Sequence, residues 1–130
     1  MDLPNCWSSE HEQQRTQASR EELVARLAQA IHDDGTTEPL DGVRLRRASA
    51  PTEIGHGVSD PSFCVIAQGS KEIMLGDNRF RYDPAQYLIA TAALPIATRV
   101  VEASEERPYL ALVLDLVKAD LLLTQIADGF

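Results

Sequence analysis

Between residues 43 and 116 the chain consists of short runs of strand-forming residues separated by turn-forming residues. Some runs alternate apolar and polar side chains, as half-buried strands do, and others are continuously apolar, as strands covered on both faces are. No helical pattern lies between them that would serve as a parallel crossover, so antiparallel pairing is expected. We therefore predict a mainly β domain, closed as a barrel or packed as a sandwich. The seven predicted strands are residues 43–46, 63–67, 71–75, 79–82, 87–91, 96–103 and 109–116.

One helix is expected ahead of the strands. Ser19 is a suitable N-cap, and Glu22 three residues later completes a capping-box pattern. An apolar stripe follows at helical spacing and stops before Gly35, a residue that tolerates the left-handed conformation common just after a helix. The pattern predicts a single helix of about a dozen residues. Its apolar stripe comprises Leu23, Leu27, Ala30 and Ile31.

The length of 130 residues and the hydrophobic content of 44% fit a single globular domain. We expect that domain to span residues 19–116, including the helix. Residues 1–18 are polar and lack periodicity, which predicts a disordered arm. Residues 117–130 change period again and are expected to begin a second, apolar helix, which would gain stability only by packing on something.

The charge balance argues against nucleic acid as a direct partner. The net charge is −8 and the pI is near 4.7, whereas binding to a polyanion depends on Lys and Arg. The tightest basic cluster, Arg44, Arg46 and Arg47, is interpreted as a solvated strand face in preference to a phosphate-binding patch. No apolar run is long enough to cross a membrane, and the first residues do not resemble a secretory signal, so we expect a cytoplasmic protein.

Residues capable of catalysis or metal binding are sparse. The histidines, His11, His32 and His56, are far apart in sequence, whereas a metal site generally needs about three converging ligands. Cys64 lies in an apolar strand, where burial makes a thiol inert. Glu105 and Glu106 lie on a predicted solvated turn. We therefore expect no catalytic residue, no metal and no cofactor.

Aromatic side chains on the predicted strands are candidates for lining a ligand cavity. Barrels of this size either fill their interior with side chains or hold one small molecule. Aromatic residues on strands are more often plain core, and a one-residue register slip would reverse which of them face inward. The candidates for the effector pocket are Phe63, Phe80, Tyr82 and Tyr87.

A string of short motifs in a fixed order carries a family resemblance. Each motif is weak alone, and their order and spacing across residues 23–128 make the match specific. The chain resembles the N-terminal domain of one branch of the AraC/XylS family of bacterial transcription regulators. The motifs are PSFCVIAQGSK at residues 61–71, LGD at 75–77, YDPAQYL at 82–88, LP at 94–95, EAS at 102–104, PYL at 108–110 and LDL at 114–116.

The resemblance implies a fold and a function. It implies a cupin-like antiparallel β-barrel that receives a small-molecule signal and mediates dimerisation. Residues 117–130 correspond to the start of the family's helical dimerisation segment, so its apolar residues Leu122, Leu123 and Ile126 are candidates for dimer contacts. The helix-turn-helix motifs of the family are not found in the sequence, so we expect no direct DNA binding by this chain.

Two alternatives to a small-molecule sensor stay open at this point. One is a cupin-type enzyme that acts on a small molecule and contains a metal. The other is a stand-alone partner that forms mixed dimers with full-length regulators through its terminal helix. The sequence does not identify the effector.

Overall fold

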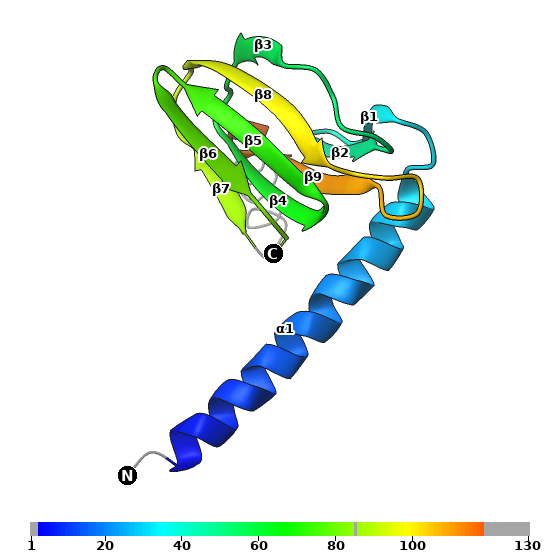
Figure 1. Ribbon diagram of the computed structural model, residues 1–130, viewed down its shortest axis with the longest axis vertical. Helices are drawn as coiled ribbons and strands as arrows, with labels where there is room; N and C mark the ends of the chain where they lie inside the picture. Colours follow the sequence, from blue (N-terminus) through cyan, green and yellow to red (C-terminus); the bar gives the residue numbers. More distant parts are fainter. Residues whose placement is uncertain (1–2, 85, 119–130) are drawn as a thin grey trace, which may run out of the picture.

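The computed structural model describes residues 3–84 and 86–118 (Figure 1). Within these residues the chain forms one long helix and nine strands, which confirms a mainly antiparallel β fold. The seven predicted strands are all present, and two more are found. In chain order the elements are α1 (Leu3–Ala30), β1 (Gly35–Leu40), β2 (Val43–Ala48), β3 (Gly55–Val58), β4 (Ser62–Gln68), β5 (Ser70–Leu75), β6 (Asn78–Tyr82), β7 (Tyr87–Ala90), β8 (Pro95–Glu102) and β9 (Tyr109–Asp115).

The strands form two antiparallel sheets. The first has the order β1-β2-β9-β4-β7, and the second has the order β3-β8-β5-β6. Side chains from both sheets share one core, so the sheets face each other in a cupin-like jelly-roll arrangement. No ladder among the described strands joins the two sheets into a continuously hydrogen-bonded barrel. The buried members of this core are Cys64, Ile66, Tyr109, Ala111 and Val113, with Ala48, Tyr82, Leu88, Val100 and Ala103 packed against them.

Helix α1 is longer than the sequence pattern predicted. It begins at Leu3, so the expected disordered arm over residues 1–18 is wrong from residue 3 onward, and Ser19 lies inside the helix instead of capping it. The physical reason is that no glycine or proline interrupts residues 5–30, and Pro4 lies in the first turn, where its missing N–H is not needed. Arg26 and Glu22 form an exposed pair at 2.8 Å, typical of a solvated helix face.

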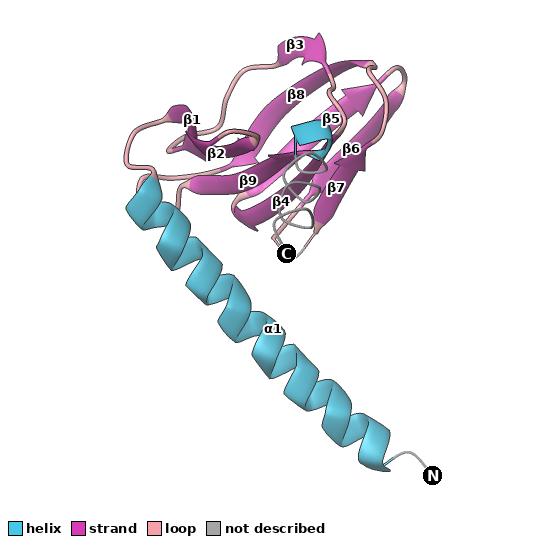
Figure 2. Cartoon of the chain, turned by 180° about the vertical axis from the view of Figure 1, so that it is seen from behind, coloured by secondary structure: helices cyan, strands magenta, loops and turns pink. Residues whose placement is uncertain are grey.

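Only the C-terminal part of α1 packs on the sheets. Leu27 and Ile31 are buried against Leu45, Ala67 and Leu110 on the outer face of the first sheet. Three members of the predicted stripe therefore face the core, with Leu23 partly buried, whereas Ala30 is exposed. The N-terminal part of the helix projects away from the sheets (Figures 1 and 2).

The two strands that the sequence pattern missed are edge strands. β1 pairs with β2, and its register shifts between Thr37 and Leu40, a stretch that contains Pro39. Proline lacks a ladder donor and is tolerated at a sheet edge. β3 pairs with β8 and lies between the predicted strands at residues 43–46 and 63–67. The residues of both strands are exposed, so they carry no alternation of apolar and polar residues by which they could be recognised.

A second helical segment begins directly after β9. Residues 116–118 are helical, and the Asp115 carboxylate accepts hydrogen bonds from the backbone N–H groups of Val117 and Lys118 at 3.0 and 3.1 Å. This is the geometry of an N-cap. The predicted start of a helix near residue 117 is thereby confirmed, but the dimerisation candidates Leu122, Leu123 and Ile126 lie outside the described residues. A search of the described helices finds none long and apolar enough to span a membrane.

Candidate functional site

The space between the two sheets contains a pocket with mainly apolar walls. It has a volume of about 190 Å³ and lies where β6, β7 and β8 come together beside β5. Two of the four predicted effector-pocket residues, Phe80 and Tyr82, line it, and both come from β6. Other lining residues are Ile73, Leu75, Leu88 and Ile96.

The structure does not bring the other two candidates, Phe63 and Tyr87, to this pocket. Cys64 pairs with Leu88 across β4 and β7, and both point into the core between the sheets. Because side chains alternate along a strand, the residues next to this pair point to the outer face. The rings of Phe63 and Tyr87 meet there with centroids 5.4 Å apart, and Tyr87 is 62% exposed.

A second pocket of about 190 Å³ has basic walls. It lies at the gap where β1 and β2 approach β8, and Thr52 bridges this gap by exchanging hydrogen bonds with the backbone of Val100. Four cations line it: Arg46 and Arg47 from β2, Lys71 from β5 and Arg99 from β8. Arg47 and Arg99 are paired with Asp34 and Glu72. Tyr109 from β9 adds a hydroxyl group.

Strand alternation explains why arginines reach the space between the sheets. On β2, Leu45 packs under α1, whereas Ala48 packs in the inter-sheet core. Arg44 and Arg46 share the face of Ala48, and their Nε atoms are buried without a hydrogen-bond partner in the described structure. The interpretation of this cluster as a solvated strand face is therefore wrong for Arg44 and Arg46. Arg47 points outward, where it pairs with Asp34.

Lys71 is the most unusual residue of the basic pocket. Only 9% of its surface is exposed. Burial lowers the pKa of its amine because a charged group loses its hydration. The nearby Cys64 partly opposes this lowering of the pKa, and the positive charge of Arg46 adds to it. No carboxylate in the described part of the chain pairs with Lys71, Arg44 or Arg46.

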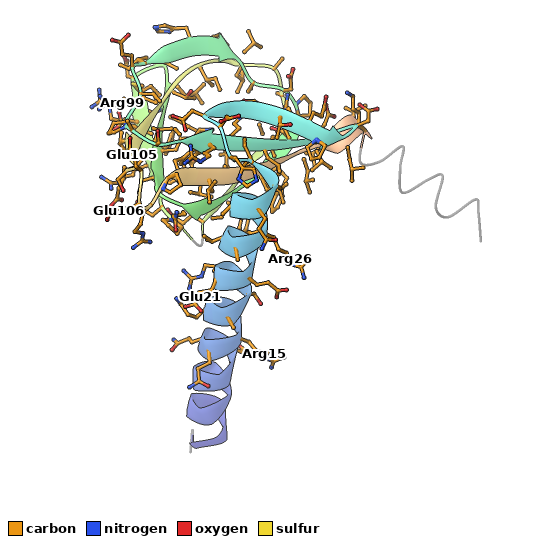
Figure 3. All side chains as sticks on the ribbon, turned by 90° about the vertical axis from the view of Figure 1, so that its right-hand side faces the viewer. Arg15, Glu21, Arg26, Arg99, Glu105 and Glu106 are labelled. Atoms are coloured by element: carbon orange, nitrogen blue, oxygen red, sulfur yellow. The ribbon has the colours of Figure 1, made fainter. Side chains whose placement is uncertain are left out.

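The nearby carboxylates already have other cationic or hydroxyl partners. Glu72 binds Arg99 and Arg79, and Figure 3 shows Arg99 at the periphery of the sheets. The hydroxyl oxygen of Ser70 lies 2.6 Å from a carboxylate oxygen of Asp83 and 2.8 Å from one of Glu102, so its proton can be donated to either. None of these three carboxylates, Glu72, Asp83 and Glu102, forms an ion pair with Lys71.

Tyr109 adds a hydroxyl group to the same pocket. Its side chain is 3% exposed, and its hydroxyl is buried with no hydrogen-bond partner among the described residues. Burial raises the pKa of this phenol far above its ordinary value, so it remains a neutral donor. Buried hydroxyl groups usually have a partner, so an unpaired one facing a pocket indicates room for a polar ligand or a water.

A tight turn brings β5 against β9 at this pocket. Gly69 has a φ of +82°, and a Cβ there would lie 2.6 Å from the backbone oxygen of Glu102 and 2.9 Å from the Cα of Tyr109. Only glycine permits this approach without displacing the backbone. The turn therefore fixes the start of β5, and with it Lys71, beside Tyr109.

Sequence reasoning missed Arg46, Lys71 and Tyr109 as members of one site. The detectable signal was Lys71 itself, which shares a strand face with the apolar residues Ile73 and Leu75. The described residues contain no group of three or more His, Cys, Asp or Glu side chains placed to hold a metal ion. Cys64 is buried and free, as expected for a structural thiol.

Comparison with solved structures finds cupin proteins of low sequence identity. A cupin-2 domain protein of Shewanella frigidimarina is 5% identical, with a TM-score of 0.46 over 67% of this chain and 86% of that one. A cupin superfamily protein of Desulfitobacterium hafniense is 17% identical, with a TM-score of 0.45 over 62% and 72%. The cupin domain of Cnp3 from Schizosaccharomyces pombe is 14% identical, with a TM-score of 0.45 over 66% and 63%. No curated protein sequence matches.

The family comparison is decisive. The model of the AraC-type transcriptional regulator N-terminus matches residues 39–126, which include every strand from β2 to β9. This match spans well over half of the 130 residues. The chain therefore belongs to the family of N-terminal domains of AraC-type transcriptional regulators.

Proposed function

We propose that this chain is a non-catalytic regulatory domain that senses a small molecule bound between its two sheets. The observation that supports this most is the pair of pockets in the shared interior, one apolar and one basic. Protein interiors are normally packed to high density, and a pocket with a few convergent polar groups is the usual form of a small-molecule site. Family membership supplies the regulatory context.

A thermal-shift screen of small metabolites tests this proposal, because a compound that binds the folded domain raises its midpoint of unfolding. The expected result is that at least one compound class stabilises the domain in a concentration-dependent way. Ala90→Leu narrows the apolar pocket and should abolish stabilisation by a compound bound there. Ala97→Leu is the matched control, since Ala97 lies on β8 between the inward residues Ile96 and Thr98 and points outward. A domain that no compound stabilises would contradict sensing.

We also propose that residues 117–130 mediate a homodimer or a mixed dimer with a full-length regulator. Support comes from the capped start of a helix at residues 116–118 and from the apolar residues Leu122, Leu123 and Ile126 that follow. Sedimentation of the wild type and of the double variant Leu122→Glu, Leu123→Glu tests this, with a monomeric wild type counting against it. Co-purification with a full-length regulator tests the mixed dimer.

A cupin-type enzyme is the alternative to a non-catalytic domain. A cupin-type enzyme predicts bound metal after purification without chelator, so stoichiometric metal by elemental analysis would contradict a non-catalytic domain.

The acidic charge supports the absence of direct DNA binding by this chain. We place the protein in the cytoplasm, where transcription regulators meet both metabolites and DNA.

A further inference from the structure

The basic pocket contains positive charge and hydrogen-bond donors that no group in the described structure satisfies. Arg47 and Arg99, which also line it, are paired with Asp34 and Glu72, and three donors from three strands are left: Arg46, Lys71 and Tyr109. Lys71 and Tyr109 are both more than nine-tenths buried, and the Tyr109 hydroxyl and the Arg46 Nε are without a hydrogen-bond partner. Burying an unpaired charge or donor costs free energy, and such groups in folded proteins normally have a partner.

Hydrogen-bonding chemistry decides what kind of partner fits. Arginine and a protonated lysine have no acceptor, and the phenol of Tyr109 stays protonated, so the group that satisfies all three must accept hydrogen bonds. It must also offset positive charge, because Arg46 and Lys71 repel each other in a poorly hydrated space. A planar oxyanion meets both requirements, and guanidinium groups bind carboxylates in a two-pronged manner.

The remaining walls limit the size and polarity of the ligand. Thr98 and Val100 of β8 contribute a hydroxyl and an apolar surface to the pocket. The volume of about 190 Å³ corresponds to a molecule of several non-hydrogen atoms, since a water in the liquid occupies roughly 30 Å³. A short organic acid fits these limits, with its carboxylate toward the basic side chains and a small neutral body against β8.

We propose that the pocket between β2, β5 and β8 binds a small organic carboxylate, held by Arg46, Lys71 and Tyr109. This inference rests on the proposed sensing function and specifies the chemical class of the effector. In the absence of the anion the amine of Lys71 is buried without a carboxylate partner among the described residues. In its presence the charge is neutralised, so binding stabilises the arrangement of the three strands around the pocket.

The test compares an acid with its neutral isostere. Thermal unfolding of the wild type is followed with sodium butyrate, sodium lactate and inorganic phosphate, with butyramide as the uncharged analogue and sodium chloride at matched ionic strength. We expect butyrate or lactate to raise the midpoint of unfolding in a saturable way, and butyramide and chloride to have no saturable effect. Stabilisation by phosphate alone would assign the site to a phosphate group and overturn the carboxylate assignment.

Three variants assign any binding to the pocket. Lys71→Met and Arg46→Gln should each weaken binding of the carboxylate at least tenfold, because each removes one charged partner. Tyr109→Phe removes only the hydroxyl and should weaken binding severalfold while leaving the fold intact, which circular dichroism checks. Arg79→Gln is the matched control, since Arg79 loses the same charge at a side chain that is 65% exposed, and its binding should be unchanged.

The outcomes separate this inference from the function on which it rests. Butyramide binding as tightly as butyrate, or equal carboxylate binding by the wild type and Lys71→Met, would overturn the anion site and leave small-molecule sensing standing. Failure of every carboxylate to exceed chloride would also overturn it, while stabilisation by neutral metabolites would preserve sensing. Absence of stabilisation by any compound would remove both.

Discussion

The inter-sheet space has two pockets of similar size and opposite chemistry. Both pockets measure about 190 Å³, and both have β5 in their walls. At one end β5 contributes Lys71, and at the other it contributes Ile73 and Leu75. A position two residues along the same strand face thus changes the interior from basic to apolar. Burial alone therefore does not make this interior apolar, because one pocket has ordinary core residues in its walls and the other has cations without a carboxylate partner among the residues that the structure describes.

The most severe way to break this contrast is to place a cation at the apolar end. Ile73 is 6% exposed among apolar neighbours, so Ile73→Lys would bury a charge with neither partner nor solvent. We expect a loss of about 3–5 kcal/mol in the free energy of unfolding, which is enough to unfold many domains of this size. Urea denaturation measures the loss. Ile73→Leu, which conserves volume, should cost less than about 1.5 kcal/mol, and a similar cost for both variants would show that the site does not discriminate charge.

The opposite substitution removes the contrast from the basic end. Lys71→Met replaces the buried amine with an apolar chain of similar shape, so the unliganded domain should become more stable by roughly 1–3 kcal/mol. Chemical denaturation in buffer free of carboxylates and phosphate is the measurement. A destabilised variant would mean that Lys71 already has a compensating partner in solution.

The same two proteins should respond differently to pH. The pKa of Lys71 is lowered in the folded state, so between that lowered value and its ordinary value of 10.5 the unfolded chain binds more protons than the folded one. Stability attributable to Lys71 therefore rises with pH through this window. The advantage of Lys71→Met over the wild type should shrink as the pH rises toward 10.5.

Comparison with the variant isolates Lys71 from the other titrating groups around it. Tyr109, Cys64 and Arg46 lie near Lys71. Because these residues are present in both proteins, their contributions largely cancel in the difference. A stability difference that stays constant from neutral pH to above 10 would contradict a perturbed Lys71.

The smallest expected effects concern Phe80 and Tyr87, two exposed aromatic residues at and near the apolar pocket. Phe80 lines the apolar pocket but is 45% exposed, and Tyr87 lies outside the pocket and is 62% exposed. Phe80→Ala and Tyr87→Ala should each cost less than about 1.5 kcal/mol, because partly exposed rings lose little burial. If a ligand occupies the apolar pocket, Phe80→Ala should weaken its binding in a titration calorimeter, and Tyr87→Ala should not. Equal weakening by both would show that the effector contacts the outer face of β4 and β7.

The sequence predicts the strands better than it predicts the site. Seven strands follow from local patterns of apolar and aromatic residues, even β6, which is mostly exposed. β1 and β3 were missed because they are exposed edge strands without such a pattern. The start of α1 was placed at Ser19 because a capping-box pattern forms there. The residues on both sides of Ser19 are compatible with a helix, so the helix continues through this position.

The candidate site depends on register, which a single sequence does not contain. Phe80 and Tyr82 line a pocket because they pair with inward-facing residues of β5. Phe63 and Tyr87 lie next to the inward pair of Cys64 and Leu88 and therefore point outward. Arg46 was misinterpreted for the same reason. Its neighbour Arg47 is on the outer face, and a one-residue difference separates an arginine paired with Asp34 from one directed into the interior.

The two faces of β2 contact different parts of the molecule, so a movement of this strand affects both. Leu45 supports α1 from one side of this strand, and the next residue, Arg46, faces the basic pocket from the other. Only one backbone layer separates the two contacts, so any displacement of β2 at Arg46 also moves the surface on which the last turns of α1 rest. Helix α1 is about 40 Å long, at 1.5 Å for each of its 28 residues, and it rests on the sheet at that point. A tilt of a few degrees at its base would shift its far end by several ångströms.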